Sequence, residues 1–126
     1  MPRPPRRGPR SQRPLPPPPA TGPDGLPQVA LTPRGTERWQ SGHPWIYRAD
    51  LLHLPPLAGG EVVRVVDPRG WFLGKAFYSS TSKIALRWMS FEDVEVGREL
   101  LAARIAQADA LRRALYPGET TYRVVH

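Results

Sequence analysis

The sequence predicts a mainly β fold: a small strand-rich domain, then one long helix and the first strand of an incomplete α/β domain. Two observations support this. Short runs of aromatic and β-branched residues, separated by Pro- and Gly-containing turns, fill residues 28–90. From about residue 98 to 116 the apolar period becomes that of a helix. A length of 126 residues allows one domain, or one small domain plus a fragment of another.

Residues 1–26 are predicted to form a disordered tail, with order beginning near Gln28. The first 25 residues hold 10 of the 17 prolines and five arginines. Such a segment has few backbone donors and little apolar bulk to bury. It could contact RNA or offer a polyproline ligand to a partner groove, or it is an unselected extension.

The first part of the domain reads as strand, short helix, strand and loop. The expected ranges are Val29–Thr32 for the first strand, 36–40 for the helical segment, Pro44–Arg48 for the second strand and 54–60 for the loop.

The clearest hairpin joins Val62–Val66 to Trp71–Tyr78. Between them, Asp67-Pro68-Arg69-Gly70 has Asp first, Pro second and Gly fourth, which is the preference of a type I turn. Gly70 is expected to take a positive φ as the chain re-enters the sheet. A hairpin in the middle of the strand-rich part is therefore predicted.

After a turn at 79–82, the next strand is expected to be half buried. Alternation assigns its residues to two faces. Ile84, Leu86 and Trp88 form the covered face, whereas Lys83, Ala85 and Arg87 form an open face with two positive charges.

The predicted helix over 98–116 has an apolar stripe and a charged pair. Asp109 can pair with Arg112 or Arg113 one turn later. Pro117-Gly118 ends the helix, and Thr121–Val125 is then expected to begin a new strand. The stripe consists of Leu101, Ile105, Ala108, Leu111 and Leu115.

Composition excludes several classes of site. Without cysteine the chain cannot form a disulfide, a zinc–thiolate site or a thiolate nucleophile. Three scattered histidines do not predict a metal site, and no apolar run predicts a membrane span or a signal peptide, so a cytoplasmic location is expected. Of the net charge of +7, residues 1–25 carry +4 and the rest only +3.

Most of the four tryptophans are expected in the core, with at most one exposed for base stacking. His43 has no nearby carboxylate or nucleophile in the sequence. A hydrogen bond that fixes the turn at Pro44 is therefore expected of it, rather than acid–base chemistry.

Four strings now permit a comparison with a known family. His43-Pro44-Trp45-Ile46-Tyr47 resembles the HPW-[VI]-[FY] element of the cytosine-5 methyltransferases of 23S ribosomal RNA. The segment 63–78 is similar to that family's V-x-V-x-D-x-x-G-x-F-L-G-x-G-x-Y. Ser82, Ile84 and Arg87 match N-x-x-S-x-I-x-x-R, and 121–126 matches Y-R-[LV]-[VI]-H. Ala76 and Ser79 depart from the family's usual Gly and Asn.

The resemblance implies a PUA-like RNA-binding β-barrel over 27–90 and the start of a central α/β domain over 91–126. In the family, a domain that binds S-adenosylmethionine follows, and ribosomal RNA is the partner. Carbon-5 methylation requires a cysteine thiolate, so the chain alone is expected to be non-catalytic. No catalytic, cofactor-binding or metal-binding residue is therefore assigned, and S-adenosylmethionine is implied only for the full-length family.

Two other functions stay open: a stand-alone PUA-type RNA-binding module, and an interaction protein that uses its proline-rich arm. The oligomeric state is also open, a homodimer being one arrangement.

The candidate RNA contacts are all basic. Lys83 and Arg87 come first, because they are predicted to share an open strand face. Each would neutralise one phosphate, although a merely solvated charged face has the same pattern. The other candidates are Lys75, Arg64 and Arg69 of the hairpin, and Arg34, Arg38 and Arg48 around the HPW element.

Overall fold

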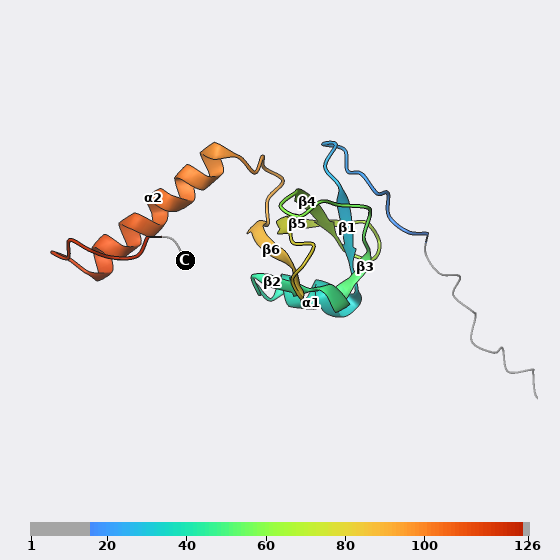
Figure 1. Cartoon of the computed structure of the whole chain (residues 1–126), viewed down its shortest axis with the longest axis horizontal. Helices are drawn as coiled ribbons and strands as arrows, with labels where there is room; N and C mark the ends of the chain where they lie inside the picture. Colours follow the sequence, from blue (N-terminus) through green and yellow to red (C-terminus); the bar gives the residue numbers. More distant parts are fainter. Residues whose placement is uncertain (1–15, 125–126) are drawn as a thin grey trace, which may run out of the picture.

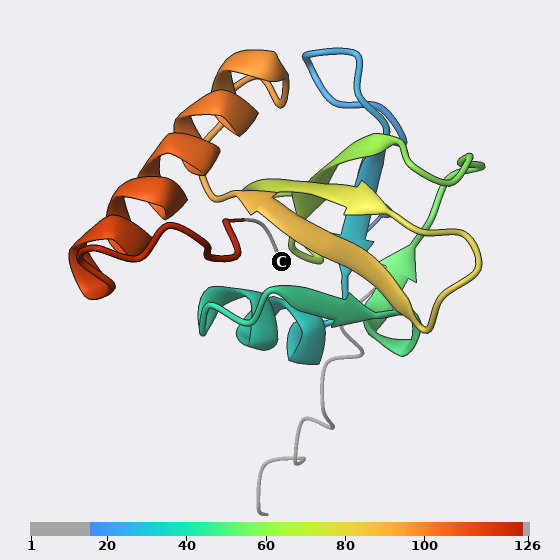
Figure 2. The same ribbon diagram turned by 60° about the vertical axis from the view of Figure 1, so that its left-hand side comes forward.

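The computed structural model describes residues 16–124, which form a curled six-stranded sheet and two α-helices (Figure 1). The strand order is β2-β6-β5-β4-β1-β3, in which only β1 and β4 pair in parallel. The sheet curls into a half-barrel, with α1 on one side of it (Figure 2). The elements are β1 (Gln28–Leu31), α1 (Pro33–Gln40), β2 (Trp45–Tyr47), the 3-10 turn η1 (Arg48–Asp50), β3 (Leu51–His53), β4 (Val62–Val66), β5 (Phe72–Tyr78), β6 (Ile84–Ser90) and α2 (Arg98–Leu115).

Local chemistry accounts for the start of α1 and the β4–β5 turn. Thr32 caps α1, since its hydroxyl accepts a hydrogen bond from the Gly35 N–H at 3.0 Å. In the hairpin, Gly70 N–H donates to the Asp67 carbonyl at 3.0 Å, and Gly70 has a φ of 90°. The predicted turn is confirmed.

Strand pairing divides the sheet into an inner and an outer face. Ile46, Leu86 and Tyr78 are cross-strand neighbours in β2, β6 and β5, and all three are buried. They belong to one core with Trp39 of α1, which closes over the inner face. The core cluster is Val29, Leu31, Trp39, Ile46, Val63, Val65, Ala76, Tyr78 and Leu86.

The mainly β fold with a long helix after it is confirmed, but three local expectations are wrong. The 54–60 loop is preceded by β3, a three-residue strand that pairs with β1 and was not predicted. Residues 121–124 form no strand; Val125, the rest of that prediction, lies outside the described residues. Order also begins before Gln28: within 16–124, Gly22 N–H donates to the Leu26 carbonyl at 2.9 Å and Gln28 Nε2 to the Pro19 carbonyl at 3.0 Å. The predicted tail therefore ends earlier than residue 26, and its residues 1–15 lie outside the described part.

Helix α2 lies beside the sheet, as Figures 1 and 2 both show. The predicted pair forms between Arg113 Nε and Asp109 Oδ2 at 2.8 Å. None of the helix's residues is buried, so most of its apolar stripe faces outward. Among residues 16–124, no helix combines the length and apolar character that crossing a membrane requires.

Candidate nucleic-acid interface

The eight predicted RNA contacts divide into three groups by exposure. Arg64 and Lys75 are buried, and Arg38 and Arg48 are half-buried. The exposed group is Arg34, Arg69, Lys83 and Arg87. The exposed group can meet a phosphate without a rearrangement of the fold, whereas Arg64 and Lys75 cannot.

Two of the predicted RNA contacts, Arg64 and Lys75, are not accessible at the surface. They are direct cross-strand neighbours on the outer face, yet only 5% and 4% exposed. Arg64 Nη1 lies 2.9 Å from both Asp24 Oδ2 and Asp93 Oδ1, while Lys75 Nζ lies 3.3 Å from each of the same oxygens. The two aspartates come from the loop before β1 and the segment after β6. These two segments cover half of the outer face and neutralise both cations.

Arg64, Lys75, Asp24 and Asp93 form an ionic cluster, and its ion pairs shift the pKa values of both aspartates and of Arg64. Burial disfavours the Asp24 carboxylate, but hydrogen bonds from Arg64, Leu26 N–H and Lys75 outweigh burial and lower the Asp24 pKa. The hydrogen bond from Arg64 is the main cause that lowers the Asp93 pKa. Burial of Arg64 is likewise outweighed by its two aspartate partners, so the Arg64 pKa is raised. Both carboxylates and the Arg64 guanidinium are therefore charged at neutral pH.

Arg48 and Arg38 have structural partners. Arg48 donates to the Ser82 carbonyl at 2.9 Å and to the Tyr78 hydroxyl at 3.2 Å, which ties η1 to the β5–β6 turn. Arg38 Nε lies 3.6 Å from Asp50 Oδ2, and its guanidinium lies over the Tyr47 ring at 5.1 Å. Arg48 also donates to the Ser79 carbonyl at 2.5 Å, so three of its five N–H donors are used within the protein. The Arg38 side chain remains 25% exposed.

Arg87 lies on the half of the outer face that these loops leave open. It is the cross-strand neighbour of Phe77 in β5 and of Trp45 in β2. The predicted alternation with Lys83 fails at Ala85, which is fully buried, because the β2–β6 register shifts between Ile46 and Tyr47. Both cations are nevertheless exposed, and within residues 16–124 neither forms an ion pair with a carboxylate.

Two tryptophans are exposed, rather than the single one expected. Trp45 is 42% exposed and Trp71 is 71% exposed, whereas Trp39 is buried. The structural role predicted for His43 is confirmed, because Trp45 N–H donates to His43 Nδ1 at 3.2 Å. The position of Trp45 beside Arg87 was not predicted from the sequence. The alternation of the aromatic Trp45 and Tyr47 around the apolar Ile46 could have indicated that both rings lie on the face opposite the core.

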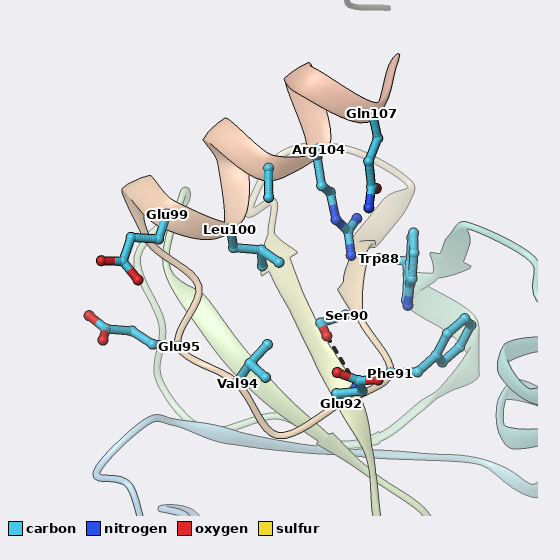
Figure 3. A pocket seen from close by; sticks show the side chains of 11 residues that line it. Trp88, Ser90, Phe91, Glu92, Val94, Glu95, Glu99, Leu100, Arg104 and Gln107 are labelled. Atoms are coloured by element: carbon cyan, nitrogen blue, oxygen red, sulfur yellow. Dashed lines mark hydrogen bonds between the residues drawn. The ribbon is translucent and has the colours of Figure 1, made fainter. Parts of the chain in front are cut away.

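A cleft of about 510 Å³ between the end of β6 and α2 is a poor site for a phosphate (Figure 3). Glu92, Glu95 and Glu99 line it, and a polyanion would be repelled there. The Arg104 guanidinium stacks on the Trp88 ring at 4.4 Å instead of pointing into open space. The electrostatics favour the open outer face for nucleic acid.

The segment between β6 and α2 also does not fit S-adenosylmethionine. A nucleotide-type cofactor is usually held by a glycine-rich loop between a strand and the N-terminus of a helix. Here the segment between β6 and α2 carries Glu92, Asp93 and Glu95, with one glycine at the helix cap. Acidic side chains at that position disfavour the cofactor's carboxylate.

Comparison with known proteins adds a family and a group of relatives. A family model described as a PUA-like domain matches residues 29–91. The chain is 35% identical over 103 residues to a ribosomal RNA large subunit methyltransferase I of Shewanella amazonensis, covering 78% of this chain and 26% of that protein. A protein of the same name from Vibrio cholerae is 36% identical over 88 residues, covering 66% and 22%. The chain thus spans about a quarter of the length of these curated relatives.

Solved structures agree on the fold. A protein from Streptococcus mutans, proposed as a SAM-dependent methyltransferase, superposes with a TM-score of 0.65. The match has 16% sequence identity and covers 79% of this chain and 26% of that one. At this identity the likeness supports the architecture alone.

Proposed function

Because the chain belongs to the family of PUA-like domains, we propose that it is the RNA-binding N-terminal portion of a methyltransferase of large-subunit ribosomal RNA. The observation that carries the proposal is the 35% identity over 103 residues to a relative named for that activity. The open basic half of the outer face supports it, because phosphate contacts from Lys and Arg supply much of the affinity of RNA-binding proteins.

In this proposal, methyl transfer takes place outside the chain. The matched relatives are about four times longer, and the segment between β6 and α2 does not fit S-adenosylmethionine. Methylation at carbon 5 of a cytosine requires a thiolate to add to the ring, and the chain has no cysteine. The chain's own contribution is to hold the ribosomal RNA, while the rest of the enzyme supplies the cofactor and the nucleophile.

Lys83→Ala combined with Arg87→Ala is expected to weaken binding to a fragment of large-subunit ribosomal RNA. Each lost phosphate contact lowers the slope of log K against log salt by about 0.7, so the slope becomes shallower by about 1.4. At 0.1 M salt this corresponds to about a 25-fold weaker association. Fluorescence anisotropy titrations at several salt concentrations measure both quantities.

The matched control removes the same charge elsewhere. Arg98→Ala with Arg113→Ala, both on exposed positions of α2, leaves the slope unchanged if the outer face is the interface. An unaltered slope in the Lys83/Arg87 variant would remove these residues from the interface. Failure of the unmodified chain to bind ribosomal RNA would refute the proposed function itself.

A further inference from the structure

The open half of the outer face carries a row of aromatic and basic side chains. The row is fixed by strand register: Phe77 of β5 pairs with Arg87 of β6, and Arg87 pairs with Trp45 of β2. Directly paired residues share a face of the sheet. Tyr47 follows Trp45 on the same side, since Ile46 between them is fully buried.

Two of these rings are exposed at the surface of the sheet. Trp45 is 42% exposed and Tyr47 is 37% exposed, and they lie next to each other on an edge strand of the sheet. Large apolar rings gathered on a surface commonly mark a binding site. The His43 ring contacts Trp45, and the Arg38 guanidinium lies over the ring of Tyr47.

These neighbours hold the rings in place. His43 accepts a hydrogen bond from the Trp45 N–H, and the two rings meet edge to face with centroids 6.2 Å apart. Arg38 lies over Tyr47 and is itself held by Asp50, which is buried. Rings fixed before binding lose little entropy when a flat ligand stacks on them.

The positive charge beside the rings indicates which kind of ligand fits this surface. Arg87 lies directly beside Trp45, and the one acid among the contacts above, Asp50, is already paired with Arg38. A ligand that matches this surface has a flat π face for Trp45 and a negative charge for Arg87. An unpaired nucleotide has both, whereas A-form duplex RNA keeps its base faces stacked inside the helix.

We propose that Trp45, Tyr47 and Arg87 form a stacking platform for unpaired bases, so that the chain binds single-stranded rather than double-helical RNA. This inference rests on the proposed function and specifies the state of the RNA. Trp45 stacks on a base, Arg87 neutralises the adjacent phosphate, and Arg38 keeps Tyr47 in position to receive a second base. An apolar protein partner would use the rings but would have no need of Arg87.

The test compares Trp45→Ala with Trp71→Ala on two probes, a fluorescein-labelled 12-nucleotide oligoadenylate and a 12-base-pair RNA duplex. Trp45→Ala is expected to weaken binding to the single strand by about tenfold, the usual effect of losing one stacked base. Its salt slope is expected to stay unchanged, because no phosphate contact is lost. Trp71→Ala removes an even more exposed tryptophan from the turn end of the β4–β5 hairpin and is expected to leave the affinity unchanged.

The outcomes distinguish failure of the stacking platform from failure of the proposed RNA-binding function. Equal affinity of Trp45→Ala and the unmodified chain for the single strand overturns the platform, while retained ribosomal RNA binding keeps the proposed function. Equal weakening of the single strand and the duplex also overturns the platform. If the unmodified chain dimerises in light scattering and Trp45→Ala is a monomer, the rings serve contact between two copies instead, and the platform is again refuted. Recovery of single-strand binding by Trp45→Phe supports stacking.

Discussion

Replacing Trp39 with alanine is expected to lower the free energy of unfolding by about 3 to 5 kcal/mol, the usual cost of truncating a buried tryptophan. Trp39 is 1% exposed and belongs to the same core as Val63 and Leu86. It is the large apolar side chain that α1 inserts into the half-barrel. For a domain of about 100 residues, each kcal/mol lowers the melting temperature by about 4 to 8 °C. Thermal unfolding followed by circular dichroism measures the loss.

Two further contacts make Trp39 hard to replace. Its Nε1–H donates to the Leu73 carbonyl at 3.0 Å, and its ring packs edge to face against Phe91 with centroids 5.9 Å apart. The ring also passes over Gly74 so closely that a Cβ there would lie 2.6 Å from Trp39 Cζ2. Helix α1, β5 and the end of β6 therefore all depend on one side chain.

A matched tryptophan provides the control for this prediction. Trp71→Ala removes the same side chain from a site that is 71% exposed, and a change within about 0.5 kcal/mol is expected. Trp39→Phe keeps most of the apolar contact and loses the N–H, so a loss of at least about 1 kcal/mol is expected. Similar losses in the Trp39→Ala and Trp71→Ala variants would show that α1 contributes little to the core.

The sequence predicts the parts of this fold that depend on neighbouring residues. Asp67 and Gly70 define a turn by themselves, so the hairpin and the bounds of β4 are correct. The turn role of His43 is also local, since its partner Trp45 is two residues away. β3 was missed because Leu51–His53 is short and its strand character comes from pairing with β1.

The candidate site was harder to predict because exposure depends on distant segments. Arg64 and Lys75 occupy outward positions, as alternation requires, but Asp24 and Asp93 cover them. These aspartates are 40 and 29 residues away from Arg64 in the sequence. Periodicity gives the face on which a side chain lies and cannot show what packs over that face. Register shifts have the same effect at Ala85, where an expected open position is buried.

The ionic cluster is the second place where a small change is expected to have a large effect. Arg64 and Lys75 are like charges in direct cross-strand contact, an arrangement that destabilises a sheet unless counter-charges are present. Asp24→Asn together with Asp93→Asn removes both counter-charges and leaves two cations buried. The double variant is therefore expected to be less stable than the unmodified chain. The loss is expected to be smaller than for a fully buried ion pair, because the Asp24 and Asp93 side chains are 27% and 52% exposed and solvent screens their charges.

The pH dependence follows from the lowered pKa values of the two aspartates. Their ordinary value is 3.8, and both pKa values lie below it in the folded chain. As the pH falls, the aspartates of the unfolded chain therefore bind protons before those of the folded chain. The stability that the two carboxylates contribute is fully present above about pH 4 to 5, and it is lost as the pH drops through their pKa values in the folded chain. Denaturant unfolding between pH 7 and pH 2 measures this, and the double variant is expected to lose stability less steeply below pH 4 than the unmodified chain.

A variant with four substitutions separates charge from packing. Adding Arg64→Met and Lys75→Met to the Asn pair removes the uncompensated cations, and apolar side chains of similar length often replace a buried ionic group at little cost. This variant is expected to recover most of the stability that the Asn pair loses. If it stays as unstable as the double variant, the loss comes instead from hydrogen bonds such as that from Lys75 Nζ to the Val94 carbonyl at 2.8 Å. Recovery would show that Asp24 and Asp93 stabilise the sheet by neutralising one half of its outer face, which leaves Arg87 and its neighbours as the charged half that remains open to a ligand.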